Sequence, residues 1–209
     1  FNFMARGEPL ANRALIADAD GLLGKLARLA VALGLRPQYL VSTIYPREFG
    51  DRPLEDVFVT HHPDLHYSIY SMSDRFRRRW LPRALPAEAA LDRLTSWQRS
   101  TGKIVTLHHA YIAGENDAEG DVHAVCDALE ERGLVAHVNV VRYNPHDPAR
   151  HGVEPPGDVI ERNAAIYRAR LPAARVGVIA RVGFDVAASC GMFFGPGGAA
   201  ADLVPLRPA

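Results

Sequence analysis

The sequence predicts an α/β protein built on a parallel sheet, because short apolar runs alternate with longer amphipathic runs along most of its length. Leucines recur at helical spacing from Leu15 to Leu33, and Gly34 follows as a helix stop. Polar residues interrupt the pattern where the apolar runs end. An open doubly wound sheet and a barrel both place ligands at the carboxyl ends of their strands. The pattern therefore predicts a site at that edge and leaves both architectures open.

The expected elements follow in regular order along the chain. Strands are predicted at residues 1–4, 39–41, 65–69, 104–112, 135–141 and 176–182. Helices are predicted at residues 15–33, 86–99, 121–132 and 157–170. We expect one domain over residues 1–193 and an irregular tail, rich in glycine and proline, over residues 194–209.

The composition is that of a soluble globular protein, with 48% hydrophobic and 23% charged residues among 209. Twenty-four basic residues balance twenty-four acidic ones, so the overall charge gives no argument for a nucleic-acid partner. The two cysteines, Cys126 and Cys190, are too few for a disulfide framework and suit a reducing, cytoplasmic location. No apolar run approaches the roughly 20 residues that span a bilayer, so no membrane partner is expected.

Polar residues with useful chemistry follow four of the predicted strands. Gly7 and Glu8 follow the first strand, and Gly7 would allow a ligand to approach the backbone closely. Glu8 offers a carboxylate to an amine. Ser42, residues 68–70 and Asn144 follow later strands, and their polar groups suit a carboxylate, a ribose or a base. The alternative is that these residues only form turns, where Gly, Ser and Asn are common.

Six segments, in order, carry a resemblance to one known family. They are residues 3–12 with their Gly-Glu-Pro sequence, 41–43, 65–82, 114–117, 138–145 and 183–191. Together they resemble the radical S-adenosylmethionine (SAM) enzymes and, more narrowly, the ribosomal RNA adenine methyltransferases of the RlmN and Cfr type. The resemblance implies a partial (β/α) barrel of the radical SAM type whose amino-terminal part is missing from this chain.

The resemblance also implies an activity and roles for individual residues. The intact protein would be an enzyme that methylates an adenine carbon in ribosomal or transfer RNA through a methyl-cysteine intermediate. Cys190 would carry the methyl group as a thiolate, which is the nucleophilic form of cysteine. The residues implied to bind SAM are Gly7, Glu8, Ser42, Ser68, Ile69, Tyr70 and Asn144.

The same resemblance implies further parts that this chain does not include. A [4Fe-4S] cluster held by a CxxxCxxC motif is expected upstream of the Gly-Glu-Pro segment, together with a second catalytic cysteine. We therefore expect no metal ligands in this chain, and an electron donor such as flavodoxin or ferredoxin as a partner. Tyr70 stands where the family has histidine, while Ala187 and Ser189 replace an aspartate and an alanine before the cysteine. Two alternatives follow: a divergent radical SAM enzyme with another substrate, or a non-catalytic remnant that binds SAM or RNA.

Three other features have a functional and a structural interpretation. Arg75, Arg77, Arg78 and Arg79 are interleaved with aromatic residues and either contact RNA or form a solvated helix face. The histidine pairs at 61–62 and 108–109 suggest a metal, but adjacent residues on a strand point to opposite faces and cannot chelate one ion. Cys126 has apolar neighbours at helical spacing, so we expect it in the core.

Overall fold

A six-stranded parallel sheet forms the centre of the molecule. The computed structural model describes residues 1–4, 7–144 and 152–181. The strands stand side by side in the order in which they occur along the chain, and each pair of neighbours is parallel. They are β1 (Asn2–Phe3), β2 (Leu40–Thr43), β3 (Asp64–Ser68), β4 (Val105–Ala110), β5 (Ala136–Val141) and β6 (Val176–Val178). All six predicted strands are present. In the described part of the chain β1 and β6 are the two edges, so the sheet is open, as in a partial barrel.

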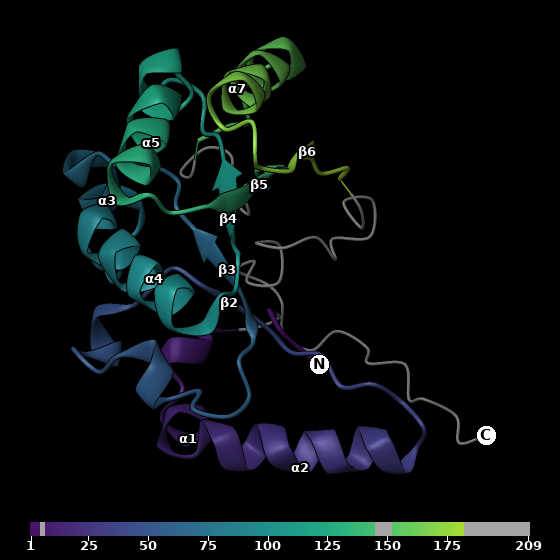
Figure 1. The fold of residues 1–209 in the computed structure, drawn as a ribbon. Coiled ribbons are helices and arrows are strands. Elements are labelled where there is room, and N and C mark those ends of the chain that lie inside the picture. Colours follow the sequence, from purple (N-terminus) through teal and green to yellow (C-terminus); the bar gives the residue numbers. More distant parts are fainter. Residues whose placement is uncertain (5–6, 145–151, 182–209) are drawn as a thin grey trace, which may run out of the picture.

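The helices form an arc around one face of this sheet (Figure 1). In chain order they are α1 (Arg13–Ala17), α2 (Ala19–Ala32), α3 (Asp74–Trp80), α4 (Ala87–Thr101), α5 (Glu119–Arg132) and α7 (Gly157–Arg170). Short 3-10 turns η1 (Pro9–Ala11), η2 (Arg47–Phe49) and η3 (Leu54–Asp56) complete the connections. No helix within the described ranges is long and apolar enough to cross a membrane.

The long helix predicted from Leu15 to Leu33 is divided in two at Asp18. The backbone of Asp18 is not helical, with φ −150°, and its carboxylate accepts a hydrogen bond of 3.0 Å from the amide of Gly21. Aspartate is a preferred N-cap residue because it satisfies an amide that has no partner within the helix. The capping preference of one residue therefore overrides the continuous leucine spacing. Gly34, with φ +70°, follows the end of α2 as predicted.

The core lies between the sheet and its helices. Alternate strand residues, including Val41, Tyr67 and Leu107, point toward the helices and are completely buried. Trp97 on α4 and Cys126 on α5 are buried against the same face, which confirms the core position predicted for Cys126. The intervening strand residues point to the opposite face, where many of them are polar. The sequence alternation therefore separates an apolar face from a polar one.

Candidate functional site

A cavity of about 510 Å³ lies on the polar face of the sheet, at the carboxyl ends of its strands. Ser42, Ser68, Tyr70 and Asn144 all line this cavity, although they are far apart in sequence. Its other lining residues are Met4, His66, His108, Ala110, Asn139, Val141, Arg142, Tyr143, Ile179, Ala180 and Arg181. Four of the seven residues implied to bind SAM are therefore gathered around one space.

The register of the strands brings these polar side chains together. Ser42 of β2 pairs with His66 of β3, and Ser68 pairs with His108 of β4. His108 in turn pairs with Asn139 of β5. Because paired residues on neighbouring strands point to the same face, hydroxyl, imidazole and amide groups form a continuous polar floor to the cavity.

Two histidines interact at the centre of this floor. His66 Nδ1 lies 2.8 Å from His108 Nε2, and the side-chain amide nitrogen of Asn139 lies 3.3 Å from the same His108 atom. An amide nitrogen only donates, so His108 Nε2 accepts both bonds and His66 Nδ1 carries a proton. Burial lowers the pKa of His108 to about 4, with a further contribution from His66, and burial also lowers the pKa of His66. The pair is therefore neutral at pH 7, and His66 Nε2 is a hydrogen-bond acceptor.

Tyr70 has a left-handed backbone, with φ +53°, which is costly for a residue other than glycine. The buried side chain of Asn116 holds this turn. Its amide nitrogen donates to the carbonyl oxygens of Tyr70, at 2.7 Å, and Ala110, at 3.0 Å, while its oxygen accepts from the amide of Ile112 at 2.7 Å. Asn116 belongs to residues 114–117, one of the six segments that carry the family resemblance, so this segment supports the cavity wall beside it.

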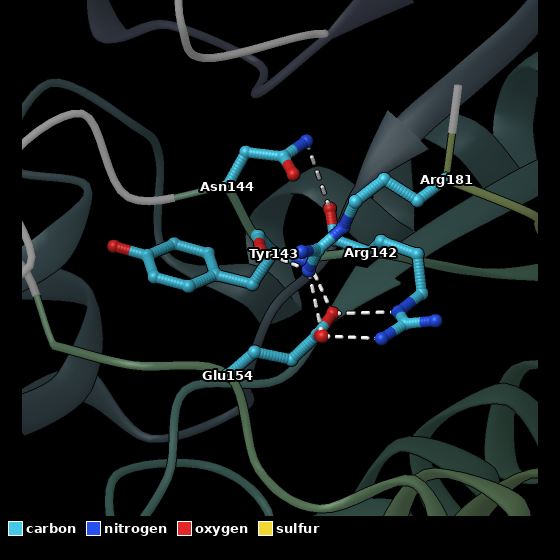
Figure 2. A network of polar contacts seen from close by, with 5 residues as sticks. All are labelled: Arg142, Tyr143, Asn144, Glu154 and Arg181. Carbon is cyan, nitrogen blue, oxygen red and sulfur yellow. Dashed lines mark hydrogen bonds and ion pairs between the residues drawn. The ribbon is translucent and has the colours of Figure 1, made fainter. Parts of the chain in front are cut away.

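The β5–β6 side of the cavity carries a network of charged side chains (Figure 2). Glu154 accepts hydrogen bonds from Arg142 Nε at 2.8 Å and from Arg181 Nη2 at 2.7 Å. The amide of Tyr143 also donates to Glu154, at 2.9 Å. Burial favours the protonated acid, but the hydrogen bonds and charge of Arg142 and the charge of Arg181 outweigh it and lower the pKa of Glu154. Glu154 is therefore an anion at neutral pH.

Gly7 and Glu8 do not line this cavity. They line a separate hollow of about 700 Å³ beside η1, α1 and α2. The carboxylate of Glu8 accepts hydrogen bonds from the amides of Leu10, at 3.0 Å, and Ile44, at 2.9 Å. Burial raises the pKa of Glu8, and these bonds oppose the rise. The side chain thus fixes η1 to the end of β2, and its predicted contact with an amine stays a prediction.

Two other predicted site residues, Ile69 and Arg77, are buried and do not line the cavity. The side chain of Ile69 is completely buried and does not line the cavity. Arg77, predicted to contact RNA, is only 3% exposed. Its guanidinium donates to the carbonyl oxygens of Ile69, at 2.8 Å, and Leu85, at 2.7 Å. Arg77 was therefore wrongly predicted to be available to RNA, because it satisfies buried backbone acceptors.

The other three arginines of α3 are exposed, as the RNA hypothesis requires. Arg79 Nη1 lies 2.6 Å from a carboxylate oxygen of Glu115, and the indole nitrogen of Trp80 donates to the same carboxylate at 3.2 Å. Arg75 and Arg78 remain candidates on the surface of this helix.

A metal centre is not present among the described residues, where no group of three His, Cys, Asp or Glu residues could hold an ion. Cys126, the cysteine that the structure describes, is buried in α5, and burial raises the pKa of its thiol to about 11. This position does not fit a ligand of an iron–sulfur cluster, which requires several accessible thiolates. Cys190, the predicted methyl carrier, and the predicted tail at 194–209 lie outside the described residues.

The sequence analysis did not identify several residues that line the cavity or contact its lining. The two-residue alternation of a strand could have indicated His66, His108 and Asn139, because it places them on the same face as Ser42 and Ser68. The sequence could not have indicated Arg142, Glu154 and Arg181, because their contacts join distant parts of the chain.

The fold is similar to that of a known protein structure. The chain superposes on a radical SAM methyltransferase from Sphaerobacter thermophilus with a TM-score of 0.71 and 24% sequence identity, over 91% of this chain and 53% of the other. This likeness confirms the predicted fold, a partial barrel of the radical SAM type.

Comparison of sequences shows similarity to a narrower group of proteins, the RNA methyltransferases. It is 30% identical over 148 residues to a probable dual-specificity RNA methyltransferase RlmN from Synechocystis sp., covering 68% of this chain and 39% of the relative. It is 28% identical to a ribosomal RNA large subunit methyltransferase Cfr from Bacillus velezensis, covering 93% of this chain and 55% of the relative. No protein-family model matches. The predicted resemblance to the RlmN and Cfr methyltransferases is confirmed, and the chain spans about half the length of these relatives.

Proposed function

We propose that this chain is the SAM-binding part of an enzyme that methylates RNA by radical SAM chemistry. The proposed target is an adenine carbon in ribosomal or transfer RNA, and the proposed methyl carrier is Cys190. The observation that carries the proposal is the cavity at the carboxyl ends of the strands, where Ser42, Ser68, Tyr70 and Asn144 meet in a chain similar to RlmN and Cfr.

The described residues suit a ligand of the size and polarity of SAM. Cofactor pockets commonly enclose 300–1,000 Å³ and present a few polar groups in fixed positions. The cavity of about 510 Å³ presents the hydroxyls of Ser42 and Ser68 and the neutral imidazole of His66. These groups would hydrogen-bond the hydroxyl and amine groups of the adenosine part. SAM, when bound, would supply the methyl group.

The charges of the cavity would orient this ligand. SAM carries an ammonium, a sulfonium and a carboxylate at neutral pH, so its net charge is positive. The two arginines on the β5–β6 side would repel the cationic part. We therefore place that part toward β1, where Met4 lines the cavity and the Gly7–Glu8 segment follows.

The cluster, the reductant and the second cysteine belong to the proposal only through the family resemblance. The described residues do not fit a [4Fe-4S] cluster, so no step of the reaction is derived from them. A divergent radical SAM enzyme with another substrate is a second candidate, which is favoured by Tyr70 in the position of the family's histidine.

The first experiment measures binding of SAM to this chain by isothermal titration calorimetry. Ser68→Ala should weaken binding about five- to tenfold, because one lost hydrogen bond costs about 1 kcal/mol. Ser100→Ala on α4, where the hydroxyl donates to the carbonyl oxygen of Trp97 in the same helix, is the matched control and should bind like the wild type. Equal affinities of the wild type and Ser68→Ala would contradict this use of the cavity.

The second experiment concerns the cysteine. In the full-length protein, mass spectrometry should detect a methyl group on Cys190, and Cys190→Ala should abolish RNA methylation. Cys126→Ala is the matched control, because the buried thiol of Cys126 has a raised pKa and suits packing alone. RNA methylation by the Cys190→Ala variant would end the methyl-carrier hypothesis.

A further inference from the structure

The turn that follows β3 has an unusual backbone. Tyr70 is left-handed, with φ +53°, and the amide of Ser71 donates to the carbonyl oxygen of Ile69 across the turn at 2.6 Å. A hydrogen bond between residues two apart, around a central residue with a positive φ, is the pattern of a left-handed γ-turn, which is rare and strained. Glycine adopts positive φ angles freely, but tyrosine does not. Contacts from the surrounding structure must therefore keep Tyr70 in this conformation.

Buried side chains supply these contacts. Asn116 Nδ2 donates to the carbonyl oxygen of Tyr70 at 2.7 Å. Arg77 Nη1 donates to the carbonyl oxygen of Ile69 at 2.8 Å and to that of Ser71 at 3.4 Å. Three consecutive carbonyl groups of the turn therefore accept hydrogen bonds from side chains that are almost completely buried. Neither Asn116 nor Arg77 lines the cavity, so both hold the turn from behind the cavity wall.

Asn116 also connects the ends of two strands. Its amide nitrogen donates a second bond, of 3.0 Å, to the carbonyl oxygen of Ala110, the last residue of β4, whereas Tyr70 follows the end of β3. Its side-chain oxygen accepts from the amide of Ile112 at 2.7 Å. An amide group has two hydrogens to donate, so these bonds fix its orientation. Tyr70 and Ala110 both line the cavity, and one buried side chain thus sets the relative position of two wall residues.

Asn116 and Arg77 differ in where their other hydrogen bonds end. Arg77 also donates to the carbonyl oxygen of Leu85, between α3 and α4, at 2.7 Å, and so stabilises the connection between two helices. The backbone groups that Asn116 contacts lie after β3 or at the end of β4, beside the cavity. Loss of Asn116 should therefore change the cavity with less effect on the helical layer.

We propose that Asn116 is a positioning residue for the SAM site, which keeps Tyr70 in its left-handed turn and thereby holds the cavity wall in the shape that binds the ligand. This inference rests on the proposed function. Asn116 does not line the cavity and acts through Tyr70 and Ala110. Without its side chain, the turn spends part of its time in a relaxed conformation. The apparent affinity for SAM then falls with the fraction of molecules that keep the binding shape.

The test compares the SAM affinities of two variants by isothermal titration calorimetry. Asn116→Ala should weaken binding about fivefold, the size expected for one lost hydrogen bond. The loss is partial, because His109 also forms a hydrogen bond with the backbone of Tyr70. Leu94→Ala on α4 is the control for general destabilisation, because it shortens a completely buried core side chain that does not line the cavity. It should bind SAM within about twofold of the wild type. Equal weakening by the two variants would overturn the proposal, since Asn116 would then act on stability alone.

A double-mutant cycle tests whether Asn116 acts through Tyr70. Tyr70→Gly removes the need to hold the turn, because glycine adopts the left-handed conformation without strain, although the loss of a wall side chain itself weakens SAM binding. Adding Asn116→Ala to Tyr70→Gly should weaken binding by less than about twofold, compared with about fivefold when Tyr70 is present. Fully additive effects of the two substitutions would contradict the mechanism.

A further measurement needs no ligand. Hydrogen exchange followed by NMR reports the opening of the turn through the amide of Ser71, which donates across it. In Asn116→Ala this amide should exchange about fivefold faster relative to the amides of α4, and an unchanged rate would refute the positioning role. Failure of the wild type to bind SAM would overturn the proposed function and this role together. SAM binding by the wild type that Asn116→Ala leaves unchanged would overturn the positioning role alone.

Discussion

Two adjacent histidines on β4 show how differently the two faces of the sheet are built. His109 points toward the helices, where it is completely buried and its Nδ1 lies 2.7 Å from the hydroxyl of Tyr167. His108 points into the cavity and contacts His66 and Asn139. Burial lowers the pKa of both histidines, to about 3 for His109 and about 4 for His108. Strand geometry alone thus gives one histidine to the core and the other to a ligand-sized space.

The largest expected difference between the two faces is in packing. Leu107→Ala on the helical face should lower the free energy of unfolding by about 2–5 kcal/mol, because it leaves a cavity in a completely buried cluster. Ser68→Ala on the opposite face should lower it by less than about 1 kcal/mol. Urea unfolding followed by tryptophan fluorescence measures both. Similar losses for the two variants would show that the polar face is as tightly packed as the apolar one.

A second contrast lies within α3, between Arg77, which is buried, and Arg78, which is exposed. Arg77→Ala should lower the free energy of unfolding by about 2–4 kcal/mol, because it removes both guanidinium donors from the carbonyl oxygen of Leu85 and leaves that of Ile69 with the amide of Ser71 alone. Arg78→Ala should change it by less than about 0.5 kcal/mol and should weaken RNA binding instead. Thermal unfolding measures the stability of both variants, and the fluorescence anisotropy of a labelled single-stranded RNA measures their RNA binding. An Arg77→Ala variant of wild-type stability would contradict the structural role.

The smallest expected effect is a dependence of stability on pH. A histidine in the unfolded chain has a pKa near 6.5, whereas the folded pKa of His108 is about 4, so the unfolded state binds more protons between these values. His108 therefore contributes stability above about pH 6.5 that is lost as the pH falls toward 4. His108→Gln should flatten the profile of unfolding free energy over this window by about 1–3 kcal/mol. Parallel profiles for this variant and the wild type would refute the lowered pKa.

Much of this fold could be predicted because its signals are local. Short apolar runs between amphipathic runs indicated all six strands, and Gly34 marked the end of α2. The edge of the sheet that carries Ser42 and Ser68 followed from the places where the strands ended, since parallel sheets bind ligands there.

The parts that could not be predicted depend on contacts between distant segments. An asparagine such as Asn116 indicates a turn in a sequence, yet its side chain donates a hydrogen bond to the carbonyl oxygen of Tyr70, 46 positions earlier. The contact between His66 and His108 requires a known register, because a shift of one residue moves a side chain to the other face. The burial of Arg77 depends on the carbonyl oxygen of Leu85, which an arginine-rich sequence does not reveal.

The strand order also determines the order in which parts of the molecule can fold during synthesis. Because every strand is a neighbour of the one before it in the chain, each strand–helix–strand unit can pack as soon as it leaves the ribosome, and none must wait for a later partner in order to extend the sheet. The cavity is different, because it needs residues from the end of β1 through the segment after β6. A growing chain would therefore acquire most of its apolar core before it could hold a ligand. Among the described strands β6 is made last, and Arg181, just beyond it, lines the site.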